Sequence, residues 1–271
     1  MNSKINTELS KIQEWLNLNK LSLNVKKTKY IVFHHKGHNT NVRLSLSINN
    51  TPIERVKTFR FLGLVLNETL TWSDHILDTA NKISKTLGIM SRLKNTLPGK
   101  VLKLIYTSLI LPRLHYCNLA WGHKPERLNG LQKRAIRLIT KSKYNAHTEP
   151  LYKEMKQLNL QDIHISNKLK FFYKLENNRL PSYFWTYMFQ ENRSNRTRSR
   201  DPYQQLVPKT AIFSTTIRFS LPTLLKNTPP LIKAKAQTHS YNGFSNYVKQ
   251  AMLQKYKTTC DINHCYICNK T

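Results

Sequence analysis

Apolar residues near the start of the chain recur every three or four positions, the spacing that places side chains on one face of an α-helix. This stripe predicts a helix over residues 5–16. The period then changes, because β-branched and aromatic residues fill 29–33, apolar and polar residues alternate strictly over 42–48, and a third apolar stretch follows at 59–66. We therefore expect residues 1–70 to form one helix and a small antiparallel sheet.

Beyond this part the helical period returns and continues for more than a hundred residues. Residues 71–74 have the spacing of a capping box, and the apolar face that follows continues to Leu93 before a Pro-Gly break. Further helices are expected over residues 101–110, 126–140, 149–158, 162–177, 181–189 and 241–253. Pro112 is expected to end the first of these. The expected fold class is α+β, with a mainly α-helical domain over 71–190 and a basic, less regular C-terminal region over 191–271.

The charge balance narrows the class of partner. The 271 residues carry 44 Lys and Arg against 14 Asp and Glu, a formal net charge of +30. The excess is spread along the chain, with 11 bases against 4 acids in residues 1–70, 24 against 8 in 71–200 and 9 against 2 in 201–271. Such a chain repels itself, so we expect a polyanionic partner such as nucleic acid. Coding drift in an A/T-rich genome would add lysines, but it does not account for the scarcity of acids.

Hydropathy and cysteine usage argue against two other classes of protein, those that span a membrane and those that are secreted with a disulfide framework. No stretch approaches the roughly 18 apolar residues of a membrane-spanning helix, and the first residues lack the apolar core of a signal peptide. Four cysteines, three of them within the last dozen residues, do not make a secreted disulfide framework. Cys117 lies in an apolar stretch near Trp121 and is expected in the core. We expect an intracellular protein, of the nucleus or the cytoplasm, with no membrane partner.

Four short motifs stand at fixed places relative to the predicted elements. Residues 24–28 read Asn-Val-Lys-Lys-Thr before the first strand, and residues 61–63 read Phe-Leu-Gly. In the helical part, residues 116–122 read Tyr-Cys-Asn-Leu-Ala-Trp-Gly and residues 131–137 read Leu-Gln-Lys-Arg-Ala-Ile-Arg. In this order, the motifs resemble the end of the palm and the thumb of reverse transcriptases from non-LTR retrotransposons, of the jockey-like kind. The resemblance covers about residues 5–220.

The resemblance implies three sets of contacts with nucleic acid. The residues implied near the phosphates of an incoming nucleotide are Asn24, Lys27 and Thr28. Lys27 would supply a cation there, and the other two would fix the turn by side chain to backbone hydrogen bonds. The implied primer grip is Phe61, Leu62 and Gly63. The donors implied along the backbone of an RNA–DNA hybrid are Gln132, Lys133, Arg134, Arg137 and Lys141. From the residues alone, a solvated lysine, an ordinary hairpin and a solvated helix face remain open alternatives.

Polymerases of this family hold two catalytic metal ions with paired aspartates, which lie upstream of the turn that resembles residues 24–28. The aspartates of this chain are Asp74, Asp78, Asp162, Asp201 and Asp261. None are adjacent and none falls in a predicted strand. Asp74 and Asp78 are one helical turn apart near a helix start, which is the ordinary response to the helix dipole. We therefore expect no catalytic residue here, and Mg²⁺ is implied only for a full-length enzyme with an upstream palm and fingers.

One cluster near the end of the sequence has the residue types of a zinc site. Its candidate ligands are Cys260, His264, Cys265 and Cys268. Cys265 and Cys268 have the spacing of a ligand pair. His264 and Cys265 are adjacent, however, and cannot easily point at one ion, and the order differs from the zinc knuckles of retroelements. A disordered tail is the favoured alternative.

These observations favour a fragment of a retrotransposon RNA-directed DNA polymerase that binds the template–primer duplex, with RNA and DNA as partners, but lacks the catalytic aspartates. Whether the chain is an enzyme stays open, since the family transfers nucleotides and this chain alone is expected to be inactive. A non-catalytic nucleic-acid-binding module and a non-functional retroelement relic are the alternatives. Steeply salt-dependent binding with a cooperative fold would favour the module, and aggregation would favour the relic.

Overall fold

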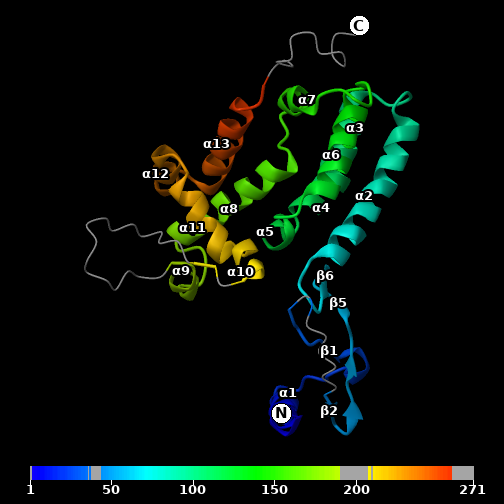
Figure 1. Ribbon diagram of the computed structural model, residues 1–271, viewed down its shortest axis with the longest axis vertical. Coiled ribbons are helices and arrows are strands. Elements are labelled where there is room, and N and C mark those ends of the chain that lie inside the picture. Colours follow the sequence, from blue (N-terminus) through cyan, green and yellow to red (C-terminus); the bar gives the residue numbers. More distant parts are fainter. Residues whose placement is uncertain (1, 36, 38–43, 190–206, 209, 258–271) are drawn as a thin grey trace. The chain divides into compact units, whose positions relative to one another are not determined.

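The computed structural model describes residues 2–35, 37, 44–189, 207–208 and 210–257. The chain divides into two compact units, Met1–Asp78 and Thr79–Thr271, and the boundary falls inside helix α2 (Ser73–Leu93). Short strands occur in the first unit and helices make up most of the second, which confirms the expected α+β class (Figure 1).

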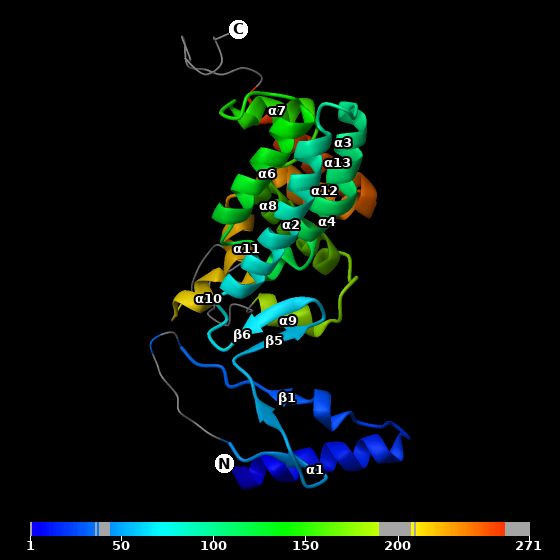
Figure 2. The ribbon, with the colours of Figure 1, turned by 90° about the vertical axis from the view of Figure 1, so that its right-hand side faces the viewer.

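Short strands in the described part of the first unit pair as three two-stranded sheets. Their bounds are β1 (Lys29–Tyr30), β2 (Ser47–Ile48), β3 (Thr51–Pro52), β4 (Glu54–Arg55), β5 (Thr58–Phe61) and β6 (Leu64–Asn67). The β2–β3 and β5–β6 pairs are antiparallel, as expected, whereas β1 pairs with β4 in parallel. The predicted strand over 59–66 is in fact the β5–β6 hairpin, because the backbone reverses at Leu62 and Gly63 (Figure 2).

A helix packed on the β2–β3 hairpin forms the core of the first unit. Helix α1 (Asn2–Leu18) confirms the helix predicted from the apolar stripe. One side of that stripe packs on the buried Leu46, Ile48 and Ile53. The side-chain amide of Asn6 donates to the Ser45 carbonyl (3.1 Å) and accepts from the Ser47 N–H (3.2 Å), which fixes the helix against the hairpin.

Helices follow one another along the described part of the second unit. Their bounds are α3 (Gly99–Ile105), α4 (Leu111–His115), α5 (Asn118–Trp121), α6 (Glu126–Ile139), α7 (Thr148–Glu154), α8 (Leu160–Glu176), α9 (Tyr183–Met188), α10 (Ala211–Thr215), α11 (Ile217–Lys226), α12 (Pro230–Thr238) and α13 (Tyr241–Gln254). Pro112 does not end the run that begins with α3. It lies in the first turn of α4, where a missing N–H costs little, after the π-helical turn η2 (Tyr106–Ile110).

Helix α8 is the element around which the second unit packs. Helices α4, α5, α11, α12 and α13 each lie against it. The Tyr173 ring stacks on Phe244 of α13, with centroids 5.1 Å apart, and the Tyr173 hydroxyl donates to the His239 carbonyl (2.9 Å). The described C-terminal helices therefore belong to the same compact unit as α8. None of the described helices is long and apolar enough to cross a membrane.

Candidate nucleic-acid interface

Helix α6 has a polar residue in the middle of its apolar face. Gln132 is fully buried, and its side-chain amide donates to the Tyr106 hydroxyl and to the Leu158 carbonyl, both at 2.9 Å. Burial raises the pKa of Tyr106 to about 12, although the hydrogen bond from Gln132 opposes this shift. Gln132 therefore joins α6 to the core, and the expectation that it donates to a phosphate is wrong.

Three basic residues in the second half of α6 lie outside the core. Arg134 is exposed, and Lys133 and Arg137 are half-buried. The Arg137 Nε donates to the Ala146 carbonyl (2.9 Å), so its guanidinium is held against the segment that follows α6. One face of α6 therefore presents cations, as the spacing of Arg134 and Arg137 predicted.

The end of α6 places Lys141 at the rim of this face. The Ser142 N–H donates to the Arg137 carbonyl (3.0 Å) and the Lys141 N–H to the Leu138 carbonyl (3.4 Å), the pairing of a Schellman motif. Lys141 takes the left-handed position of that motif (φ 54°), where glycine is usual. A cation at the negative end of the helix dipole is stabilised by about 0.3–1 kcal/mol.

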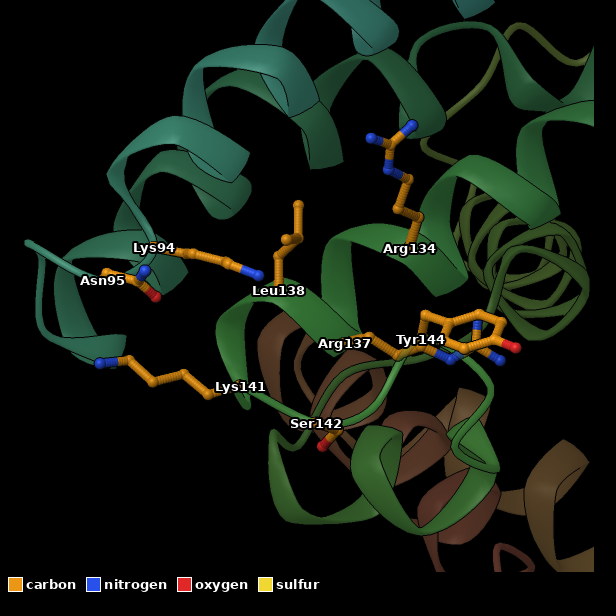
Figure 3. A pocket seen from close by; sticks show the side chains of 8 residues that line it. All are labelled: Lys94, Asn95, Arg134, Arg137, Leu138, Lys141, Ser142 and Tyr144. Carbon is orange, nitrogen blue, oxygen red and sulfur yellow. The ribbon is translucent and has the colours of Figure 1, made fainter. Parts of the chain in front are cut away.

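These side chains meet others in a pocket of about 420 Å³ between the end of α2 and α6. It is lined by Lys94, Asn95, Arg134, Arg137, Leu138, Lys141, Ser142 and Tyr144. Lys94 points from just beyond α2 toward α6, and Lys141 points back from the end of α6 toward the α2 side (Figure 3). We call this group the α6 pocket.

The chemistry of the α6 pocket suits phosphate. Four of its lining residues are cationic and none is acidic. Within the described part of the chain, the side chains of Lys94, Arg134 and Lys141 have no hydrogen bond or ion pair, so their donors are available to a ligand. The Tyr144 side chain is 88% exposed and offers a ring on which a base could stack.

Lys94, Asn95 and Tyr144 are members of the pocket that sequence reasoning missed. Lys94 and Asn95 follow the predicted end of the helix at Leu93, and Tyr144 lies in the connection after α6. No motif marks them, because they approach α6 only through the packing of α2 and the turn after α6. The sole signal was the density of bases around residues 133–143.

The Tyr-Cys…Trp-Gly motif has a structural role, because its residues pack α5 closely against α8. Asn118 is fully buried, and the His164 Nδ1 lies 2.9 Å from its Oδ1. The Trp121 indole N–H donates to the Tyr116 carbonyl (2.9 Å). A Cβ at Gly122 would stand 2.5 Å from the His164 Nδ1 and 2.6 Å from the Asn118 carbonyl, so only glycine fits this close approach.

Cys117 does not fill core, contrary to expectation. It is exposed and has the left-handed backbone conformation (φ 47°) that starts α5. The apolar stretch around it is broken there, since the chain turns between α4 and α5 to bury Asn118 and Trp121 instead.

The turn over residues 24–28 has the hydrogen bonds that were predicted for it. The Asn24 Oδ1 accepts from the Lys27 N–H (3.1 Å), and the Thr28 hydroxyl donates to the Asn24 carbonyl (3.0 Å). These bonds enclose the short 3₁₀ helix η1 (Val25–Lys27). The Lys27 side chain is exposed, with no partner among the described residues. The nucleotide contact itself stays a prediction.

The Phe-Leu-Gly motif forms the tip of the β5–β6 hairpin. Leu62 (φ 45°) and Gly63 (φ 85°) are its two turn residues, both in the left-handed region that a two-residue hairpin turn requires. The side chains of Phe61 and Leu62 are 54% and 74% exposed. The apolar tip is therefore largely exposed to solvent, and its role as a primer grip stays a prediction. Of the implied backbone donors, the structure brings together Arg134, Arg137 and Lys141, while the other two sets lie on separate turns of the first unit.

The described aspartates do not fit a two-metal centre. Asp74 accepts from the Asn67 amide (2.9 Å), and Asp78 pairs with Arg60 (3.2 Å). Asp162 accepts from the Tyr256 hydroxyl. Each carboxylate is therefore used in a separate structural contact, and no group of three or more His, Cys, Asp or Glu within the described residues could hold a metal ion. The zinc candidates Cys260, His264, Cys265 and Cys268 lie outside the described residues.

The geometry defines the class as a mainly helical α+β protein with a strongly basic pocket. No family model matches the chain, and no solved structure is significantly similar. The chain is 23% identical over 178 residues to a probable RNA-directed DNA polymerase from transposon X-element of Drosophila melanogaster. The match covers 62% of this chain but only 19% of that relative, so the chain spans about a fifth of its length. This similarity supports a relationship to a transposon reverse transcriptase.

Proposed function

We propose that this chain is the palm end, thumb and C-terminal region of a non-LTR retrotransposon reverse transcriptase, of the jockey-like kind, and that it binds the template–primer duplex without catalysing polymerisation. The observation that carries the proposal is the α6 pocket, where four cations gather with no acid in the lining. The relationship to a transposon polymerase supports nucleic acid as the polyanion.

Binding by this surface is electrostatic. Lys133, Arg134 and Lys141 would donate to phosphate oxygens, and the release of counterions from the duplex would drive association. Such contacts position a duplex but carry little sequence information, so the affinity for an RNA–DNA hybrid should vary little with sequence. In a full-length enzyme Lys27 would lie near the nucleotide phosphates and the β5–β6 tip at the primer end.

The test is the salt dependence of binding to a fluorescently labelled RNA–DNA hybrid. We expect the double variant Arg134→Gln/Lys141→Gln to lower the slope of log affinity against log salt by about 1.8, since each lost phosphate contact contributes about 0.9. Two surface contacts of about 0.5–1 kcal/mol each also predict an affinity loss of roughly 5- to 30-fold.

A matched control variant distinguishes specific contacts in the α6 pocket from the general electrostatic attraction of a positively charged protein. Lys85→Gln/Lys226→Gln removes the same charge from exposed positions that line neither the α6 pocket nor any other described pocket of this unit. This control should keep most of the affinity and slope. Equal losses in both double variants would mean that net charge alone attracts the duplex, and the α6 pocket would then have no specific role.

A further inference from the structure

A second basic hollow lies on a different set of helices in the second unit. It has a volume of about 210 Å³ and is formed by the end of α4, by α5, by one side of α8 and by the start of α13. The side chains of its wall that carry donors include His115, Asn167, Lys170, Lys174 and Tyr241, and none of its lining residues is acidic. We call it the α8 hollow.

Basic groups are crowded around the α8 hollow from four separate helices. Burial lowers the pKa of His115, and the charges of Lys170 and Lys249 lower it further. The pKa of Lys170 is lowered by burial and then by Lys249. The pKa of Lys249 is lowered by burial and then by Lys103 on α3. These groups are thus close enough to repel one another, and part of their charge is desolvated.

The walls of the hollow hold these groups in place. Asn167 hydrogen-bonds the His115 imidazole and opposes the loss of its proton. The Lys174 ammonium lies 5.8 Å from the centroid of the Tyr241 ring, which in turn packs edge-on against Tyr173 at 5.6 Å. Repulsion without an anion costs stability, whereas a bound anion would neutralise it.

We propose that the α8 hollow is a second phosphate-binding site, where His115, Lys170 and Lys174 donate to a phosphate group of a nucleic-acid backbone. The hollow has room for one phosphate and its neighbouring sugar rather than for a duplex. It shares no lining residue with the α6 pocket. The second unit would therefore hold nucleic acid at two separate places, which fixes the orientation of a strand more firmly than one contact. This inference rests on the proposed function only in taking nucleic acid as the source of the phosphate.

The first experiment measures hybrid binding by the full chain carrying Lys170→Gln/Lys249→Gln. We expect the salt slope to fall by about 0.9, since Lys170 is the one proposed phosphate donor that this variant removes. The affinity should fall by roughly 2- to 5-fold, while Lys85→Gln/Lys226→Gln changes both quantities much less. Combining the change with Arg134→Gln/Lys141→Gln should add the two effects, because the two sites share no residue.

A second readout guards against a variant that merely misfolds. Relieving the repulsion should raise the urea midpoint of Lys170→Gln/Lys249→Gln above that of the wild type, so stability and binding change in opposite directions. Inorganic phosphate should raise the pKa of His115 measured by NMR in the wild-type chain, and this rise should disappear in the variant.

The outcomes distinguish this inference from the proposed function. If only the Lys170/Lys249 variant loses affinity, the result supports the phosphate site in the α8 hollow and contradicts the proposed role of the α6 pocket. If only the Arg134/Lys141 variant loses affinity, the second site is overturned. A phosphate effect on His115 without any loss of hybrid binding would also overturn it, since the phosphate would then not come from nucleic acid.

Discussion

His164 is a buried imidazole whose protonation the fold opposes. Its Nδ1 lies 2.9 Å from the Asn118 Oδ1, and its Nε2 is buried without a partner among the described residues. Burial, and to a smaller extent the charge of Lys168, lower the pKa of His164 to about 4, although a hydrogen bond with the Asn118 backbone opposes the shift. The neutral form is therefore the one that the folded protein holds.

The stability of the protein should accordingly fall as the pH decreases from about 6.5 to about 4. In this range an unfolded His164, with an ordinary pKa of about 6.5, binds a proton that the folded form does not. The free energy of unfolding should drop by up to about 3 kcal/mol across this window, and above it the protonation of His164 should add no pH dependence.

Urea unfolding of the wild type and of His164→Asn between pH 4 and pH 7 measures this contribution. The asparagine amide can still donate to Asn118, but it does not titrate. His115 and His123 also have lowered pKa values and add a slope of the same sign to both proteins. The wild type should therefore lose more stability than the variant toward pH 4, and parallel curves would contradict the assignment.

Helix α6 has one side in the core and another side that carries the proposed phosphate donors. The Gln132 amide donates to the Tyr106 hydroxyl and to the Leu158 carbonyl inside the core, whereas the adjacent Lys133 is only half-buried. Gln132→Ala should lower the free energy of unfolding by about 1–3 kcal/mol, since it leaves two buried polar groups without their donor. It should leave the affinity of the folded protein for an RNA–DNA hybrid within about twofold.

Lys133→Gln is the matched change on the other face of α6. It should leave the urea midpoint nearly unchanged but reduce the salt slope of hybrid binding by about 0.9. Both variants are compared under conditions where each is fully folded. A loss of affinity in Gln132→Ala as large as that in Lys133→Gln would mean that the two faces are not separate.

Periodicity predicted the helices far better than the strands. The bounds of α1, α6, α8 and α13 follow closely from the spacing of apolar residues. The same spacing places Gln132 on the buried face of α6, since it stands four residues after Leu128 and four before Ile136. Because glutamine is polar and Gln132 stands beside two bases, we predicted it on the solvent side, and that prediction was wrong. Alternation predicted longer strands because it marks buried faces, whereas strand length depends on a distant partner, as for β1 and β4.

The α6 pocket was only partly predictable for a related reason. Arg134, Arg137 and Lys141 share a helix or its end, so spacing alone brings them together. Lys94 joins them from the end of α2, about forty residues earlier in the sequence, and only packing places it there. The spacing within one helix is enough to predict a row of donors on its surface. A pocket is formed by at least two elements, and the sequence does not show which elements will pack together.

The charge of the whole molecule is divided unequally between its two units. The first unit, Met1–Asp78, has 11 bases and 6 acids, and ion pairs join Lys29 to Glu54 and Arg60 to Asp78. The second unit, Thr79–Thr271, has 33 bases and 8 acids. Four bases for every acid leave most of the positive charge without a carboxylate, so the second unit should dominate the attraction of nucleic acid.

Binding and polymerisation should therefore be separable in this chain. Contacts between cations and phosphates need no metal, so EDTA should not weaken the affinity for an RNA–DNA hybrid in magnesium-free buffer. The described aspartates are engaged in separate structural contacts. We consequently expect no nucleotide to be added to a labelled primer with either Mg²⁺ or Mn²⁺ at concentrations of protein that saturate the hybrid. Affinity that falls on metal removal, or primers that lengthen in a metal-dependent way, would show that this chain holds a metal centre, and the proposal of a binding fragment would fail.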